Sequence, residues 1–146
     1  MTNTHRADAH GIHAEVVMQS LDLAGGTHRL DADFGYDPAD PYAVTVTFRT
    51  EYGDVAWTFA RELLVDGLTT PTGDGDVHVW PCLDADGSPV VMVELVSDDG
   101  ELMAQAPLWT VQRFVSRTLA AVPVGTEGDR MDLDGVVDRL LGRTAA

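Results

Sequence analysis

The residues of this sequence that could most readily bind a metal ion or move a proton are its aspartates. There are eighteen, and they are densest at Asp84, Asp86, Asp98 and Asp99. Clustered carboxylates can hold a divalent cation or act as general acid and base. Each pair is followed by a glycine, however, which is typical of tight turns, and no carboxylate completes an EF-hand spacing. We therefore predict two hairpin turns here, and neither a metal site nor a carboxylate metalloenzyme.

Histidine and cysteine offer two further possibilities. His10 and His13 could share a metal ion on a helix, but they span a loose tail and the start of a strand, with no third ligand nearby. Cys82 and His78 would share one strand face, yet a strand holds them roughly 13 Å apart, too far for direct activation of the thiol. We predict a buried thiol at Cys82. GxSxG, Walker and dinucleotide-binding glycine patterns are absent, so we predict no catalytic residue and no cofactor.

The charge of the chain excludes several classes of partner. Twenty-four acidic residues face nine basic ones, all of them arginine, and the net charge is −15. Such a surface repels phosphate backbones and anionic lipids, so we expect neither nucleic-acid binding nor membrane insertion. The single cysteine cannot form an intrachain disulfide, and the sequence has neither a secretory leader pattern nor an apolar run of membrane-spanning length. We therefore predict a cytoplasmic protein.

At 146 residues the chain has the length of one domain. Residues 1–11 lack an apolar period and predict a flexible tail, which leaves 12–146 as a single domain. Alternation of apolar and polar side chains predicts strands at 12–18, 28–36, 42–48, 55–59, 77–82, 89–96 and 102–106. The strand around Val90 is apolar on both sides, which indicates a central strand or one covered by another subunit. The stretches from Thr70 to Asp76 and from Pro123 to Gly128 are predicted to be loops.

Three helices are predicted between or after these strands. A short one, 61–66, would end at Gly67 in a left-handed cap with Leu68 folding back. A longer one would begin at Pro107 and stop before Pro123, with an apolar stripe at Leu108, Val111, Val115 and Val122. A last helix would be capped by Asp132 and carry the stripe Leu133, Val136, Val137, Leu140 and Leu141. The order is strands first, then helices.

The three tryptophans suggest different positions. Trp57 alternates with Val55 and Phe59 and is predicted to lie in the core. Trp80 is out of phase with the neighbouring valines, and Trp109 is one place off the helical stripe. Either could lie partly outside the core, where aromatic side chains anchor interfaces, or could equally cap a core edge.

Several segments together resemble the SsgA-like family of sporulation and cell-division proteins of actinobacteria, and most of all its SsgB branch. The resemblance spans roughly residues 12–141, and its most specific part is Pro-Thr-Gly-Asp-Gly-Asp-Val-His-Val-Trp-Pro at 71–81. Other matching segments are Asp-Pro-Tyr-Ala-Val at 40–44, Trp-Thr-Phe-Ala-Arg-Glu-Leu-Leu at 57–64, Gly-Leu at 67–68, Ala-Pro at 106–107, Arg-Thr at 117–118, Val-Pro-Val-Gly-Thr-Glu at 122–127 and Asp-Leu-Asp at 132–134.

The resemblance implies an α+β fold similar to the Whirly fold, with two packed antiparallel β-sheets of about seven to eight strands followed by C-terminal α-helices. It also implies a homotrimer without catalysis that is concentrated at division septa and helps to position or recruit the tubulin-like protein FtsZ, with an SsgA-like paralogue as a further partner. Within the shared motifs we assign structural roles to Trp57, Arg61, Gly67, Pro71 and Pro81, and an outward, partner-binding role to Trp80 and Trp109.

Two points qualify these assignments. We expect Arg61 to pair with a carboxylate and so to order the start of the short helix. The alternative function, binding of single-stranded nucleic acid by a Whirly-type sheet, requires a basic groove and stacking aromatics, and this chain has few cations to supply one.

Overall fold

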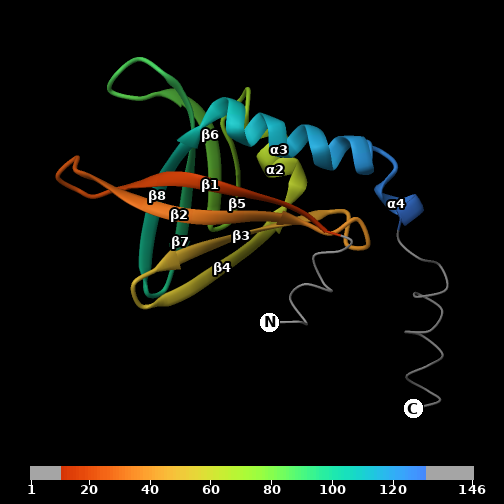
Figure 1. The fold of residues 1–146 in the computed structure, drawn as a ribbon, viewed down its shortest axis with the longest axis horizontal. Helices are drawn as coiled ribbons and strands as arrows, with labels where there is room; N and C mark the ends of the chain where they lie inside the picture. The colour runs from red at the N-terminus through yellow and green to blue at the C-terminus, as the bar shows by residue number, and fades with distance from the viewer. Residues whose placement is uncertain (1–10, 131–146) are drawn as a thin grey trace, which may run out of the picture.

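The computed structural model describes residues 11–130. Their helices and strands are β1 (Ile12–Leu21), β2 (Thr27–Tyr36), β3 (Ala43–Thr50), β4 (Gly53–Ala60), α2 (Arg61–Gly67), β5 (Thr72–Asp74), β6 (Val77–Leu83), β7 (Pro89–Ser97), β8 (Gly100–Pro107), α3 (Leu108–Ala121) and α4 (Glu127–Arg130). Figure 1 shows their arrangement. The predicted tail, apart from Gly11, and the predicted helix from Asp132 lie outside these residues. No helix within 11–130 has the length and apolar character needed to span a bilayer.

The strands form one antiparallel sheet of eight strands in the order β4-β3-β2-β1-β8-β7-β6-β5. The prediction of two packed sheets therefore needs correction. Two meanders, β1–β4 and β5–β8, are joined where β1 pairs with β8, through Gln19 with Gln105 and Ser20 with Ala104. In Figure 1 the β1–β4 strands run across the view and β6–β8 run up it, so the sheet curls and encloses a core between its two halves. The likeness to the Whirly fold stays a prediction.

The strand predictions are confirmed to within a few residues because the period of two is clear. On β1, Val16 and Met18 are buried while Glu15 and Gln19 are exposed. Strands β3 and β4 form the predicted hairpin, and β6, β7 and β8 form the predicted meander. β7 is the central strand of that meander: Val91 and Val93 face the core, and Val90 and Met92 on its other face are also buried.

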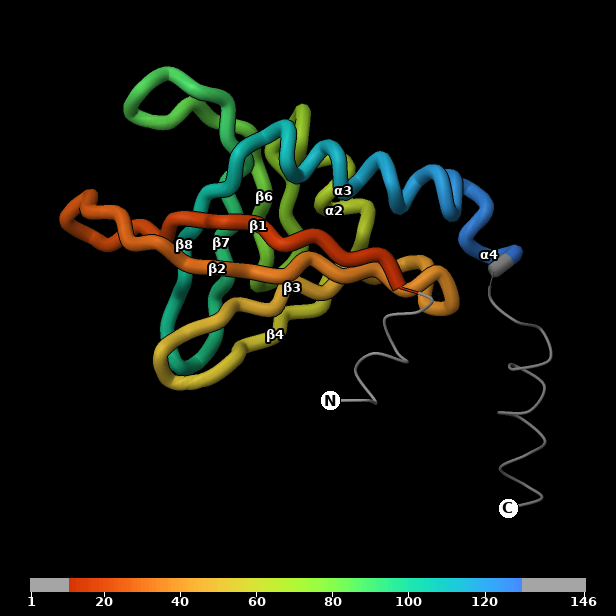
Figure 2. Tube along the Cα trace, viewed as in Figure 1, coloured from red at the N-terminus to blue at the C-terminus, as the bar shows by residue number. Residues whose placement is uncertain are grey.

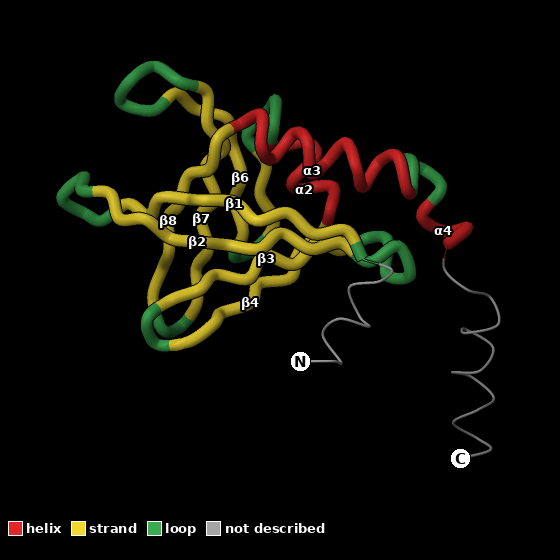
Figure 3. Tube along the Cα trace, in the orientation of Figure 1, coloured by secondary structure: helices red, strands yellow, loops and turns green. Residues whose placement is uncertain are grey.

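Helix α3 closes one side of the core by packing against β1, β7 and β8 (Figure 3). Its buried residues are Val111, Phe114, Val115 and Thr118. The Phe114 ring meets the Phe34 ring of β2 edge to face, with centroids 5.6 Å apart. The predicted stripe lacks Phe114 and Thr118 and includes Leu108, which is only partly buried. The helix itself is confirmed, one residue later than predicted, since Pro107 ends β8.

Three local predictions are wrong. The predicted loop at 70–76 contains the short strand β5, which pairs with β6, and α4 begins inside the predicted loop at 123–128. Gly67 is the last residue of α2 and is not among the glycines with positive φ, so it is not a left-handed cap. A Cβ at Gly67 would overlap Cγ1 of Val79 and lie 2.6 Å from its Cβ, so the glycine is needed for close packing of α2 on β6.

Candidate interaction surfaces

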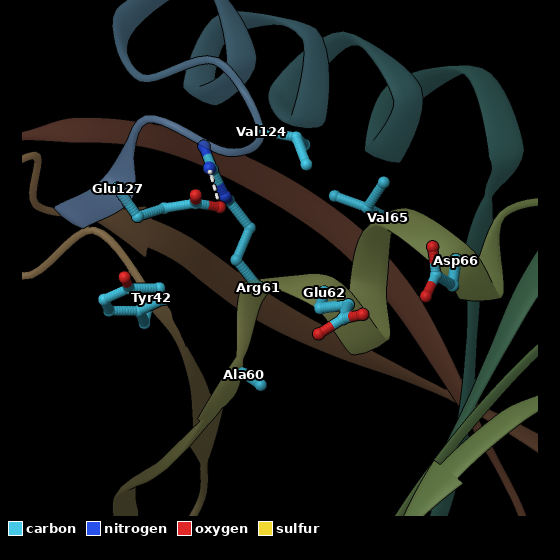
Figure 4. Close-up of a pocket in the computed structure, with 8 residues that line it drawn as sticks. All are labelled: Tyr42, Ala60, Arg61, Glu62, Val65, Asp66, Val124 and Glu127. Atoms are coloured by element: carbon cyan, nitrogen blue, oxygen red, sulfur yellow. Dashed lines mark hydrogen bonds and ion pairs between the residues drawn. The ribbon is translucent and has the colours of Figure 1, made fainter. Parts of the chain in front are cut away.

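Arg61 is the most deeply buried charged residue of the described chain. It follows β4 directly as the first residue of α2, and only 2% of its surface is exposed. Its Nη1 donates to the carbonyl oxygens of Thr118 and Val122, at 3.1 and 2.7 Å, and its Nη2 donates to Oε2 of Glu127 at 2.9 Å. Figure 4 shows the guanidinium pointing from α2 toward the α4 carboxylate. One side chain thus joins α2 to the end of α3 and the start of α4.

The charges of the Arg61 cluster are partnered by groups within the cluster. The last carbonyl groups of a helix carry partial negative charge, and a guanidinium there satisfies them. The pKa of Glu127 is held below its ordinary value by hydrogen bonding from its own backbone N–H and from the Arg61 guanidinium. The Arg61 Cζ also lies 5.0 Å from the centroid of the Tyr36 ring. Both ions are held by each other and by the backbone, which suits a structural role rather than proton transfer.

A cavity of about 340 Å³ adjoins this cluster. It is lined by Tyr42, Ala60, Arg61, Glu62, Val65, Asp66, Val124 and Glu127 (Figure 4). Tyr42 and Val124 are more than half exposed at its rim. Three carboxylates line it against one arginine that is already paired, so the cavity is unsuited to phosphate.

Trp57 lies at the edge of the core. It is on the edge strand β4 opposite Val46 and is partly buried, whereas Val55 on the same face is 45% exposed. The prediction of a core position is therefore only partly right, because Trp57 packs against the core without being enclosed by it. Trp57 lines an open apolar groove of about 320 Å³ whose other apolar walls are Leu30, Phe48, Val55, Leu95 and Leu102.

Pro71 and Pro81 lie at the same edge of the sheet: Pro71 directly precedes β5, and Pro81 is within β6. Pro71 is exposed just before β5. Pro81 pairs with Val91 of β7 and lies beyond the last β5–β6 pair, Thr72 with Val79, so no strand of the described chain covers its other side. Proline suits such an edge because it has no N–H to offer to a further strand.

Trp80 lies on the face of β6 that points away from the core and is partly buried. Its neighbour across the β6–β7 ladder is Met92. With Pro71, Thr72, Gly73, His78 and Glu94 it lines a cavity of about 310 Å³. The sequence left two positions open for Trp80, one partly outside the core and one capping a core edge. The side chain lies on the outward face.

Trp109 is 63% exposed in the first turn of α3. The guanidinium of Arg113, one helical turn on, lies 5.4 Å from the centroid of its ring. No ring contact joins Trp109 to Trp80 in the part of the chain that the structure describes. They are separate aromatic groups on different elements.

The acidic and nucleophilic residues singled out from the sequence have local partners. Asp84 accepts hydrogen bonds from the backbone N–H groups of Asp86 and Ser88, at 2.9 Å each, which confirms a turn. Within residues 11–130, no three His, Cys, Asp or Glu residues are placed to hold one metal ion. Cys82 is exposed, so the prediction of a buried thiol is wrong: its side chain is on the outward face of β6.

The histidines and arginines are also engaged. His10 lies outside the described residues, and His13 Nδ1 lies 2.9 Å from Asp33. Arg29 pairs with Asp31 and Arg49 with Glu15, each at 2.9 Å. Arg117 donates to the His13 carbonyl oxygen. The basic groove that nucleic-acid binding requires is therefore not formed by these arginines.

Comparison with known proteins identifies the family. The family model for the Streptomyces sporulation and cell division protein SsgA matches residues 30–127, which is most of the chain. This chain belongs to the SsgA family. It is 41% identical over 131 residues to the sporulation-specific cell division protein SsgB of Frankia casuarinae, covering 89% of this chain and 91% of that protein. It is 46% identical over 114 residues to SsgB of Streptomyces coelicolor, covering 77% and 82%.

Solved structures of the SsgA family have the same fold. A structure of SsgB from a study relating SsgB mutations to longitudinal cell division during sporulation of Streptomyces coelicolor superposes with a TM-score of 0.78, at 41% identity, over 82% of this chain and 94% of that one. A crystal structure of an SsgA-like sporulation-specific cell division protein from Thermobifida fusca gives 0.79 at 34% identity, over 88% and 94%. These relatives are cell-division proteins, and the nucleic-acid alternative gains no support from them.

The sequence predicts several candidate site residues but not the side chains that contact them. Glu127 belongs to a family-like segment but gave no sign of pairing with Arg61, 66 residues earlier. Nothing in the sequence distinguishes Glu94 and Met103 from other strand residues. The strand around Val90 is apolar on both sides, and this pattern indicates that the outward face of the sheet is covered or forms an interface.

Proposed function

We propose that this chain is a non-enzymatic docking protein of sporulation septation, cytoplasmic and concentrated at division septa, which helps to position or recruit the FtsZ-type septum protein. The observation that carries the proposal is membership of the SsgA family, whose relatives are named sporulation-specific cell division proteins. An SsgA-like paralogue is the second proposed partner. No cofactor is part of the mechanism.

The described surface supports docking rather than chemistry. The buried guanidinium of Arg61 and its carboxylate hold helices together, and Asp84 stabilises a turn. Apolar and aromatic side chains remain at the surface, among them Trp80 and the largely exposed Trp109. Such side chains supply most of the binding energy at protein interfaces.

The proposed assembly is a homotrimer. Three copies in one particle would attach to a filament at several points, and the combined affinity would exceed that of a single weak contact by a factor on the order of 10² where the geometry allows. The mass of the purified chain in solution tests this step. A mass of three chains is expected, and a monomer would remove the multivalent mechanism.

The partner assignment is tested by a pull-down from purified components. The tagged chain is mixed separately with the FtsZ-type protein and with the SsgA-like paralogue of its own organism. Retention of either partner, above that seen with an unrelated protein of similar net charge, is the expected result. Retention of neither would overturn the proposed function.

A further inference from the structure

The face of β6, β7 and β8 that points away from the core carries apolar side chains next to carboxylates. Core-facing and outward residues alternate along these strands, with Val93 and Ala104 buried in the core and Glu94 and Met103 turned outward. The register places Met103 opposite Glu94. Glu94 in turn is opposite His78 on β6. These side chains therefore form one row across the sheet.

Two cavities border this row on either side of Glu94. One, of about 310 Å³, is the cavity beside Trp80; the other, of about 440 Å³, reaches the β1–β2 hairpin through Leu21, Asp22 and Leu23. That hairpin projects beyond the sheet (Figure 2), and Leu23 near its tip is fully exposed. We call this surface the acidic apolar face and define it by Leu21, Leu23, Trp80, Glu94, Glu101 and Met103.

The charge of the acidic apolar face has one sign. Asp22, Glu94 and Glu101 line the two cavities, and no arginine does so among the described residues. His78 lies 3.6 Å from Glu94, and Asp22 is held by the hairpin turn and His28. Glu101 is exposed, and its carboxylate has no hydrogen bond or ion pair within residues 11–130. The face is complementary to a cationic partner.

The shape of the surface favours a helix as that partner. The backbone groups of β6–β8 are used in the strand ladders, so this face offers only side chains. A helix satisfies its own backbone and presents side chains alone, whereas an extended segment would need a free sheet edge. Together the two cavities extend from Thr72 on β5 to Leu21 on β1, a distance of four interstrand spacings, about 19 Å, which matches about 13 residues of helix. Methionine, here Met103, adapts to such helices.

We infer that the acidic apolar face binds a cationic amphipathic helix of a partner protein, with Trp80, Leu23 and Met103 taking its apolar side and Glu94 and Glu101 its lysines or arginines. This inference rests on the proposed docking function and adds the site and the chemistry of the partner. It requires neither that the partner be the FtsZ-type protein nor that it be the paralogue.

The test uses synthetic peptides of about 14 residues. The probe peptide has leucines at i, i+3, i+4 and i+7 on one face and lysines on the other. A second peptide has the same composition in an order that breaks the apolar stripe, and a third replaces lysine by glutamate. Each peptide is titrated into the full chain and its binding is measured by calorimetry. We expect the first peptide to bind, the second to bind at least about tenfold more weakly, and the third not to bind.

Variants of the chain locate the site. Trp80→Ala is expected to weaken binding by about tenfold, whereas Tyr52→Ala, which removes an exposed aromatic side chain from the turn between β3 and β4, leaves it unchanged. The double variant Glu94→Gln/Glu101→Gln is expected to weaken binding about fivefold at low salt and to reduce its salt dependence. Its matched control is Glu51→Gln/Glu62→Gln, which removes the same charge from exposed positions off the face. Thermal melting identifies any variant that fails to fold.

Three results would overturn the inference. The scrambled peptide could bind as well as the amphipathic one, which would indicate general charge attraction. The face variants could match their controls, which would place binding elsewhere. Trp80→Ala could lower the mass of the assembly, which would make the face a contact between copies of this chain. Peptide binding that persists while the FtsZ-type protein and the paralogue both fail to bind would reject the proposed function and leave this inference standing.

Discussion

Arg61 links three segments that are far apart in the sequence, and within residues 11–130 its guanidinium is the only side-chain donor to the Glu127 carboxylate. A buried cation of this kind is unfavourable alone and acceptable only with all of its partners in place. The cluster therefore fixes where α3 ends and where α4 begins. Any surface built from the α3–α4 connection depends on it.

Replacing Arg61 by methionine is expected to cost about 3 kcal/mol of unfolding free energy, because two carbonyl oxygens and the Glu127 carboxylate each lose one hydrogen-bond donor in a buried site. Arg61→Lys should recover only part, since an ammonium cannot form the same fork of hydrogen bonds. Arg49→Met is the control: its pair with Glu15 is exposed, and its loss should cost less than about 1 kcal/mol. Urea unfolding measures all three, and equal costs at positions 61 and 49 would contradict the structural role.

Gly67 provides a second test at the residue scale. Gly67→Ala is expected to destabilise the chain by about 1–3 kcal/mol, because the new Cβ meets the Val79 side chain. Gly67→Asn should lower the unfolding free energy further, since the asparagine side chain is larger than that of alanine. In the double variant Gly67→Ala/Val79→Ala the cost should be less than the sum of the single costs. A left-handed cap would give the reverse order, with asparagine tolerated better than alanine.

At the scale of elements, α3 is held to the sheet by one buried face. Phe114→Ala is expected to cost about 3–5 kcal/mol, because Phe114 is 1% exposed and packs edge to face on Phe34 of β2. Trp109→Ala, on the exposed side of the same helix, should cost less than about 1 kcal/mol. Thermal or urea unfolding distinguishes them. A similar loss of unfolding free energy for both variants would mean that α3 does not pack on the sheet through its Phe114 face.

The elements were largely predictable because their signals are local. The alternation of Val16 and Met18 with Glu15 and Gln19 predicts a strand and its buried face. The strand β1 extends a few residues past the predicted end, to Leu21. Local signals also explain the errors. A glycine after a short helix is typical of a cap, and the contact of Gly67 with Val79 comes from a strand that follows later in the chain. Phe114 was missed because its partner, Phe34, is on a strand far away in sequence.

For the whole molecule, the joining of β1 to β8 has no sequence signature. Two residue pairs connect the halves of the sheet, and nothing in Gln19 or Gln105 marks them as neighbours. A period of two predicts strands but not whether they belong to one sheet or two. The candidate surfaces were predictable only as single side chains, Trp80 above all. That Glu94 and Met103 adjoin it depends on strand register, which the sequence alone does not determine.

Stability of the whole chain should fall in acid. Hydrogen bonds from its own N–H and from Arg61 lower the pKa of Glu127, and those from His28 and Gly26 lower the pKa of Asp22. A carboxyl whose pKa is lower in the folded chain stabilises it above the unfolded-state value, about 4, and loses that contribution as the pH falls further. Unfolding free energy measured against pH should therefore decline below about pH 4, and less steeply in Glu127→Gln than in Glu62→Gln. Identical slopes would contradict this.

The central claim is that this chain acts by docking to the division machinery. Sedimentation velocity of the purified chain, alone and with the FtsZ-type protein of its own organism, tests it most directly, since one run reports both the assembly state and the complex. We predict a trimer that moves into a faster boundary when the FtsZ-type protein is added. A monomer whose sedimentation is unchanged by that protein would contradict the account.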